Sequence, residues 1–110
     1  REAVNGNWIF EGGTVEFGNR ELRRHDGTRE ELSEREVELL RYLASNTGRA
    51  IAREELLRHV WRLDPRNVET RTIDMHIANL RAKLGDNGAD PKVLVTVRGK
   101  GYMLTKGTDA

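Results

Sequence analysis

The segment from Thr70 to Tyr102 constrains the fold more than any other part of this chain. At about 100° per residue, one narrow arc of its first half is entirely apolar and consists of Ile73, Ile77, Leu80 and Leu84. Gly85 follows, and glycine commonly ends helices because it adopts the left-handed conformation without a Cβ clash. The spacing therefore predicts a helix over residues 71–84 with a single core-facing stripe.

The opposite arc of this helix carries short or slender side chains. It consists of Arg71, Thr72, Met75, Ala78, Asn79 and Ala82, and it is flanked by His76, Arg81 and Lys83. A helix face that is merely solvated more often carries Glu and Lys. The pattern therefore favours close contact with another surface, with plain solvation as the alternative.

A hairpin is predicted directly after the helix. Val93, Val95 and Val97 alternate with other residues, which predicts a strand with one valine face turned inward. Gly99-Lys100-Gly101 then supplies a tight connection to a return strand over residues 102–105. A phosphate-binding loop is the weaker interpretation, because the third glycine is missing and a strand follows instead of a helix.

The preceding half of the chain predicts a small antiparallel sheet and two further helices. The expected strands are Trp8–Phe10, Thr14–Phe17, Glu21–Arg24 and Arg29–Leu32, with a type I′ turn at Asp26-Gly27. A capping box, Ser33 to Glu36, begins the first helix. The second runs from about Arg53 to Arg62 and is closed by Asp64-Pro65, and Glu69 lies in the first turn of the third. The two tryptophans, Trp8 and Trp61, are expected in the core.

Length and composition indicate one soluble domain. A chain of 110 residues has room for one modest core, and without cysteine it has neither disulfides nor thiolate metal sites. No apolar run approaches the roughly 20 residues needed to cross a membrane, so a cytoplasmic location is expected. We interpret residues 1–7 as the end of a linker, 8–106 as the domain and 107–110 as a tail, the chain being part of a longer protein.

Charge is distributed unevenly along the chain. Residues 1–52 hold 8 Lys/Arg and 10 Asp/Glu, whereas residues 53–106 hold 11 Lys/Arg and 7 Asp/Glu. The basic excess lies with the expected third helix and hairpin, which suggests a polyanionic partner, although ordinary surface charge is the alternative.

Catalytic and metal chemistry have no support in the sequence. His25, His59 and His76 form no i, i+4 pair, and Ser33 is already explained as a helix cap. We therefore expect no enzyme activity, no cofactor and no metal site, with the histidines on the surface or satisfied by local partners.

Four blocks of the chain, in order, carry a family resemblance. They are Leu32–Leu40, Arg53–Leu57 with Val60-Trp61, Arg71–Ile77 with Leu80–Leu84, and Thr96–Tyr102. Together they closely resemble the winged-helix effector domain of OmpR/PhoB-type bacterial response regulators. The resemblance implies an α+β fold, a winged helix-turn-helix, with an N-terminal four-stranded antiparallel sheet, a three-helix bundle and a C-terminal hairpin wing. It also implies a phosphorylatable receiver domain before Arg1 and a tandem dimer on direct-repeat DNA half-sites.

Site residues follow from the same resemblance. It implies phosphate contacts by Arg71, Thr72 and His76, a base contact by Asn79, a backbone or supporting role for Arg81, and wing contacts by Thr96, Arg98 and Tyr102. Many relatives carry Arg or Lys where this chain has Ala78 and Asn79. The loop between the second and third helices, which in the family often engages RNA polymerase, comprises here Leu63, Asp64, Pro65, Arg66, Asn67 and Val68.

The residues themselves add detail to these roles. Met75 and Ala78 beside Asn79 favour thymine methyl groups, and Lys100 at the hairpin tip suits a phosphate. The leading interpretation is sequence-specific binding of double-stranded DNA in transcription control. The alternative is a winged helix that binds only proteins, but such a module is expected to have a neutral or acidic wing, unlike Arg98-Lys100.

Overall fold

Tight turns divide the first thirty residues into four antiparallel strands. They are β1 (Asn7–Phe10), β2 (Gly13–Glu16), β3 (Glu21–Arg24) and β4 (Arg29–Glu31), as the sequence predicts to within a residue. The computed structural model describes residues 6–64, 66, 70–86 and 91–105 and the backbone of 108–109. A fifth strand, β7 (Thr108–Asp109), pairs with β1, so the order is β4-β3-β2-β1-β7. This pairing extends the sheet with residues expected to form a tail.

The turn between β3 and β4 differs from the predicted type I′ turn. That type needs positive φ at both central residues, but here Gly27 has φ +89° and Asp26 is not among the residues with positive φ. The Gly27 amide donates to the Arg24 carbonyl at 3.0 Å, and the Arg24 amide donates to the Thr28 carbonyl at 2.9 Å. The loop therefore has three residues and a single left-handed glycine.

The predicted capping box begins α1 (Glu34–Ala44). The Glu36 amide donates to the Ser33 hydroxyl at 3.1 Å, and the Ser33 amide donates to the Glu36 carboxylate at 2.8 Å. Glu36 is buried, and Lys83 binds the same carboxylate at 2.7 Å. One buried acid therefore satisfies the start of α1 and joins it to the third helix.

The second helix is not a uniform α-helix. It begins as α2 (Arg53–Leu56) and continues as one π-helical turn, η1 (Leu57–Trp61). It ends at Arg62, whose φ of +58° is left-handed, with the Leu63 amide donating to the Leu57 carbonyl at 2.9 Å. The prediction that Asp64-Pro65 ends this helix is therefore corrected, because the chain leaves it at Arg62. Pro65 and Glu69 lie outside the described residues.

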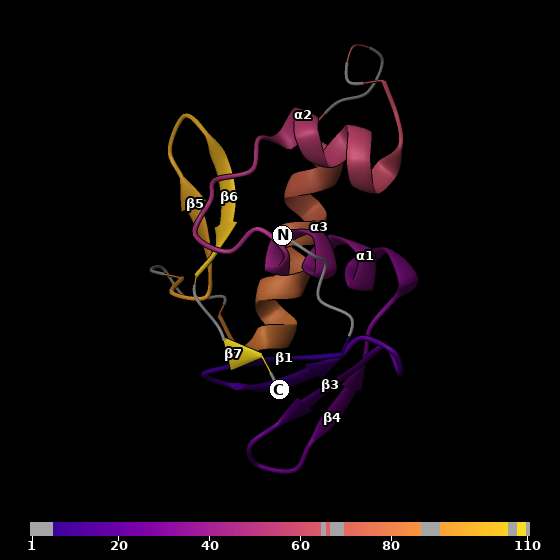
Figure 1. Cartoon of the computed structure of the whole chain (residues 1–110), viewed down its shortest axis with the longest axis vertical. Helices are drawn as coiled ribbons and strands as arrows, with labels where there is room; N and C mark the ends of the chain where they lie inside the picture. The colour runs from indigo at the N-terminus through magenta and orange to yellow at the C-terminus, as the bar shows by residue number, and fades with distance from the viewer. Residues whose placement is uncertain (1–5, 65, 67–69, 87–90, 106–107, 110) are drawn as a thin grey trace.

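The third helix, α3 (Arg71–Leu84), runs lengthwise through the molecule, with the sheet near one end and α2 near the other (Figure 1). It ends at Gly85, which has φ +73° as its predicted role requires. The hairpin of β5 (Leu94–Val97) and β6 (Gly101–Leu104) stands beside it. We call this hairpin the wing.

The wing's inward face differs from the prediction. Leu94 is fully buried, whereas Val93, Val95 and Val97 are only partly covered. Leu94 lies opposite Leu104, which is also fully buried, so the leucine pair closes the core at the base of the wing. Beyond this pair the two strands differ: on β5, Val95 and Val97 are partly covered and Thr96 is exposed, whereas on β6 both Gly101 and Tyr102 are buried.

Gly101 is required for packing inside the protein. A Cβ at this position would lie 1.9 Å from the Ile51 carbonyl oxygen, and φ is +143°. The next residue, Tyr102, exchanges two backbone hydrogen bonds with Ile51, at 2.7 and 2.9 Å. Gly101 therefore lets β6 approach the segment before α2 closely.

Two glycine substitutions in the wing should therefore differ in effect. Gly101→Ala should lower the free energy of unfolding by about 3 kcal/mol or more, because a backbone clash adds to the strained φ. Gly99→Ala should cost about 1–2 kcal/mol, since φ is +77° but no atom lies within 4 Å of its new Cβ. Urea denaturation measures both values, and equal costs would contradict the packing role of Gly101.

Candidate nucleic-acid interface

The buried stripe of α3 determines which of its side chains face solvent. All four predicted core residues, Ile73, Ile77, Leu80 and Leu84, are buried. The opposite arc is exposed along its length, and it consists of Arg71, Thr72, Met75, Ala78, Asn79 and Ala82. Met75 is 60% exposed, which is unusual for a large apolar side chain. The predicted contact face therefore exists as one continuous surface.

His76 lies at one edge of this face. Its Nδ1 is 2.9 Å from the Thr72 carbonyl oxygen, and its ring meets the edge of Trp61 with centroids 5.1 Å apart. Trp61 is only partly buried, whereas Trp8 is 2% exposed, so the prediction of two core tryptophans holds fully for Trp8 alone. The contacts hold the imidazole beside Thr72, at the boundary between α3 and η1.

Arg81 lies on the other flank and is bound to the wing. Its Nε donates to the Leu94 carbonyl at 2.8 Å, and its Nη2 donates to the Thr96 hydroxyl at 2.8 Å. These bonds cross from α3 to β5 and use donors that a phosphate contact would need. Arg81 therefore fastens the wing to α3 and orients the exposed Thr96, and its predicted role in DNA binding stays a prediction.

The tip of the wing presents two cations. Arg98 and Lys100 are exposed, and neither forms an ion pair within the part of the chain that the structure describes. The turn is closed by the Lys100 amide, which donates to the Val97 carbonyl at 2.9 Å, with Gly99 in the left-handed region. The hairpin turn is therefore as predicted, and its side chains project away from the core.

Tyr102 differs from the other predicted wing residues because it is only 4% exposed. Its hydroxyl donates to Asp74 Oδ1 at 2.6 Å and accepts from Arg53 Nη2 at 3.2 Å. Arg53 Nε also donates to Asp74 Oδ1, at 2.7 Å. The three side chains join β6, α3 and the first turn of α2, and we call them the wing cluster.

Electrostatics reinforce the wing cluster. Partial burial acts to raise the pKa of Asp74, but the hydrogen bonds from Tyr102 and Arg53 outweigh it and the pKa lies below its ordinary value. Burial, and then the bond to Asp74, raise the pKa of Tyr102. Asp74 is therefore the ionised centre on which two donors converge.

Sequence reasoning missed Arg53 and Asp74 as parts of the site. They are 21 residues apart, and Tyr102 follows Asp74 by another 28. No local periodicity connects such positions. The available signal is a carboxylate on the flank of an otherwise basic helix, which is informative only once the wing's position is known.

The loop between the second and third helices is described in part. Leu63 is 43% exposed, and the Arg66 guanidinium binds the Asp64 carboxylate at 2.9 Å. The remaining loop residues of the prediction, Pro65, Asn67 and Val68, lie outside the described residues. The described part presents an apolar side chain beside an exposed ion pair.

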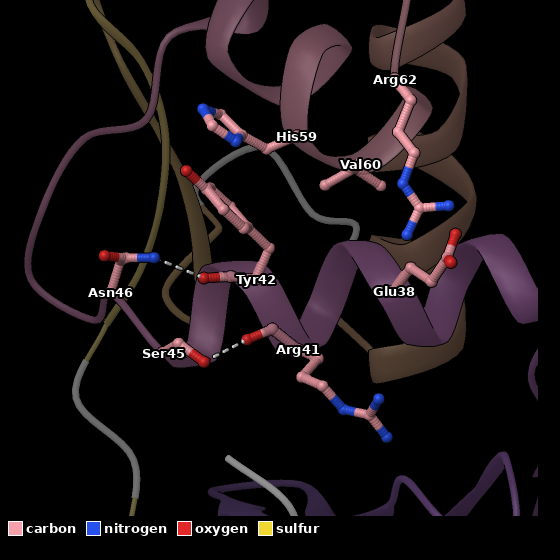
Figure 2. Close-up of a pocket in the computed structure, with 8 residues that line it drawn as sticks. All are labelled: Glu38, Arg41, Tyr42, Ser45, Asn46, His59, Val60 and Arg62. Carbon is pink, nitrogen blue, oxygen red and sulfur yellow. Dashed lines mark hydrogen bonds between the residues drawn. The ribbon is translucent and has the colours of Figure 1, made fainter. Parts of the chain in front are cut away.

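A hollow of about 560 Å³ lies between α1 and η1, away from this interface (Figure 2). It is lined by Glu38, Arg41, Tyr42, Ser45, Asn46, His59, Val60 and Arg62. The Tyr42 hydroxyl donates to Glu55, and His59 stacks on the Tyr42 ring. None of the lining residues belongs to α3 or the wing.

Other predictions about the side chains can be checked on the described residues. His25 contacts the Glu11 carbonyl at 2.8 Å, so all three histidines are on the surface or have local partners, as expected.

Among the residues that the structure describes, no group of three or more His, Cys, Asp or Glu side chains is placed to hold a metal ion. Likewise, no described helix is both long and apolar enough to cross a bilayer.

Comparison with known proteins gives consistent matches. The family model described as "Transcriptional regulatory protein, C terminal" matches residues 27–104. A probable transcriptional regulator, ycf27, of Guillardia theta is 37% identical over 97 residues, which cover 87% of this chain and 38% of that protein. The chain therefore spans well under half the length of this curated relative.

Solved structures match the fold as well. The RstA DNA-binding domain of Klebsiella pneumoniae, crystallised in complex with the RstA box, has a TM-score of 0.77 and 30% identity, covering 90% of this chain and 96% of that one. The response regulator DrrB of Thermotoga maritima, an OmpR/PhoB homologue, also has a TM-score of 0.77 and 30% identity, covering 92% of this chain and 45% of that one. Both structures therefore match about nine-tenths of this chain.

The wing cluster predicts a pH-dependent contribution to stability. Asp74→Asn should lower the free energy of unfolding by about 1 kcal/mol at pH 7, the scale of a partly solvated, hydrogen-bonded ion pair. Because the folded-state pKa of Asp74 is depressed, this contribution is present above the ordinary value of 3.8 and is lost as pH falls through the lower folded-state value. Urea denaturation over a pH series should show the two proteins converging in acid. A difference independent of pH would rule out this role for the Asp74 charge.

Proposed function

Because the chain belongs to the family of transcriptional regulatory protein C-terminal domains, as a winged-helix effector domain of the OmpR/PhoB type, we propose that α3 enters the DNA major groove while the wing reaches a neighbouring minor groove. One observation carries the proposal. A buried stripe holds α3 so that its slender face is exposed, and two cations stand free of ion pairs, among described residues, at the tip of the adjacent hairpin. A major groove about 12 Å wide admits a helix with such a face.

The α3 face supports a division of roles. Arg71, at the helix start, and Thr72 suit phosphate contacts, with His76 beside them at the edge. Asn79 projects from the middle of the face, where a carboxamide can pair bidentately with adenine N6 and N7. Met75 and Ala78 adjoin it and favour thymine methyl groups.

The exposed cations of the wing support a role in sensing the width of the minor groove. The Arg98 guanidinium can enter a minor groove, whose potential is most negative where A-tracts narrow it, and Lys100 can bind a flanking phosphate. Thr96 is exposed on β5, and Arg81 holds its hydroxyl. The buried position of Tyr102 favours an indirect contribution over the direct contact that the resemblance implies.

The longer protein is part of this proposal. Relatives extend well beyond the matched region, and DrrB is a response regulator, which supports a phosphorylatable receiver domain before Arg1. We expect two copies to bind direct-repeat half-sites in the cytoplasm and to act by binding and not by catalysis. Exposed Leu63 with the Asp64–Arg66 pair supports RNA polymerase as a partner of the loop at 63–68.

A mobility assay on random-sequence duplex tests the proposal at once. Retardation that weakens with added salt supports DNA binding, whereas no retardation at low salt leaves the protein-interaction module as the function. Selection from a random duplex library then identifies the preferred half-site for the experiments below.

One prediction about DNA binding concerns the neutralisation of phosphates by α3. Each neutralised phosphate contributes about −0.9 to the slope of log K against log salt, so Arg71→Ala should flatten the slope by about one. The affinity loss should be similar on every duplex, because phosphates carry no sequence information. Arg29→Ala, which removes an exposed arginine on β4, is the matched control and should leave the slope unchanged. If Arg71→Ala behaves like this control, Arg71 does not contact DNA.

Another prediction concerns the recognition of bases by Asn79. Asn79→Ala should weaken binding to the selected half-site by about 1–3 kcal/mol and affect random duplex much less. Its exposed position implies an unchanged thermal midpoint. The selected site should be A·T-rich at its centre. An invariant guanine at the step facing Asn79 would contradict this assignment.

A further inference from the structure

The wing is attached to α3 at two separate points. On β6, Tyr102 binds Asp74, and on β5, the Leu94 carbonyl and Thr96 hydroxyl bind Arg81. Asp74 and Arg81 are seven residues apart, which is nearly two helical turns and about 10 Å along the axis. At about 100° per residue they also lie on the same flank of α3. Two attachments at this separation oppose both sliding and pivoting of the hairpin.

Tyr102 is the residue on which these attachments converge. Arg53 and Arg81 lie over its ring, with guanidinium carbons 4.9 and 5.6 Å from the centroid. Its hydroxyl is bound to Asp74, and its backbone is paired with Ile51. The side chain is therefore held by α2 and α3 and the backbone by the segment before α2, and the buried residue is nearly inaccessible to a phosphate.

We propose that Tyr102, held by Asp74 and Arg53, is a positioning residue that fixes the distance along DNA between the bases read by α3 and the minor groove entered by Arg98. The inference rests on the proposed DNA-binding function and adds a specificity rule to it. Successive base pairs are about 3.4 Å apart along the duplex. Hydrogen bonds of this kind need donor–acceptor distances of about 2.7–3.2 Å, so a wing displaced by the length of one base pair would break them.

The test uses duplexes that share the selected half-site and differ only in the position of an A-tract, moved one base pair at a time on the wing side. Wild-type protein, titrated by fluorescence anisotropy, should prefer one position over its neighbours by about three- to tenfold, the range expected for coupled contacts. Arg98→Ala should abolish the preference and so identify the wing as its source.

Tyr102→Phe keeps the ring and removes the hydroxyl. It should reduce the preference among A-tract positions to less than about twofold while leaving affinity at the poorer positions nearly unchanged. Asp74→Asn should act in the same direction. Tyr42→Phe is the matched control, because it removes a tyrosine–carboxylate bond of the same kind between α1 and α2, and it should keep the wild-type preference.

The outcomes separate the proposals. A wild-type protein that binds DNA without preferring any A-tract position overturns this inference, and so does an unchanged preference in Tyr102→Phe. Equal loss at every position also overturns it, because that result indicates a direct phosphate contact or a loss of stability. Circular dichroism identifies a variant that fails to fold, in which case the other variant decides. No binding to any duplex refutes the proposed function itself.

Discussion

The burial of one apolar stripe on α3 is the constraint on which the rest of the structure depends. Ile73, Ile77, Leu80 and Leu84 together orient the helix about its axis, since rotation by one residue would expose part of the stripe. The opposite face then has to be solvent-exposed. The core therefore decides which side chains are available for the DNA contacts that we propose, and the sequence of the exposed face decides their chemistry.

This constraint explains how much of the fold the sequence predicts. Elements with strong local patterns, such as α3 with Gly85 or α1 with Ser33, are found where the pattern indicates. Predictions fail where packing between distant segments decides the outcome. The wing buries Leu94, Leu104 and Tyr102 and leaves its valines only partly covered, because contacts with distant segments decide which of its side chains are enclosed. The π-helical turn and left-handed Arg62 have no local sequence signal that we identified.

The features of the candidate site also differ in whether the sequence predicts them. Exposure of Arg71, Asn79, Arg98 and Lys100 follows from periodicity and turn chemistry, and the structure agrees. The position of the wing does not follow from either. It depends on Gly101, which permits close approach to Ile51, and on polar contacts between Asp74, Arg53 and Tyr102. Asp74, Arg53 and Tyr102 lie in three different elements, so only the tertiary structure shows that they are in contact.

The flanks of α3 also change how the charge of this chain is understood. Arg81 binds the wing, and Lys83 binds Glu36 and the Glu31 carbonyl, so these two cations of the helix serve internal contacts. The interface is therefore less basic than the Lys/Arg count of residues 53–106 indicates. With few cations directed at phosphates, a single domain has a limited electrostatic contribution to affinity. If the domain binds DNA as we propose, correct spacing of the α3 and wing contacts and a second copy on a neighbouring half-site are the ways in which it achieves selective binding.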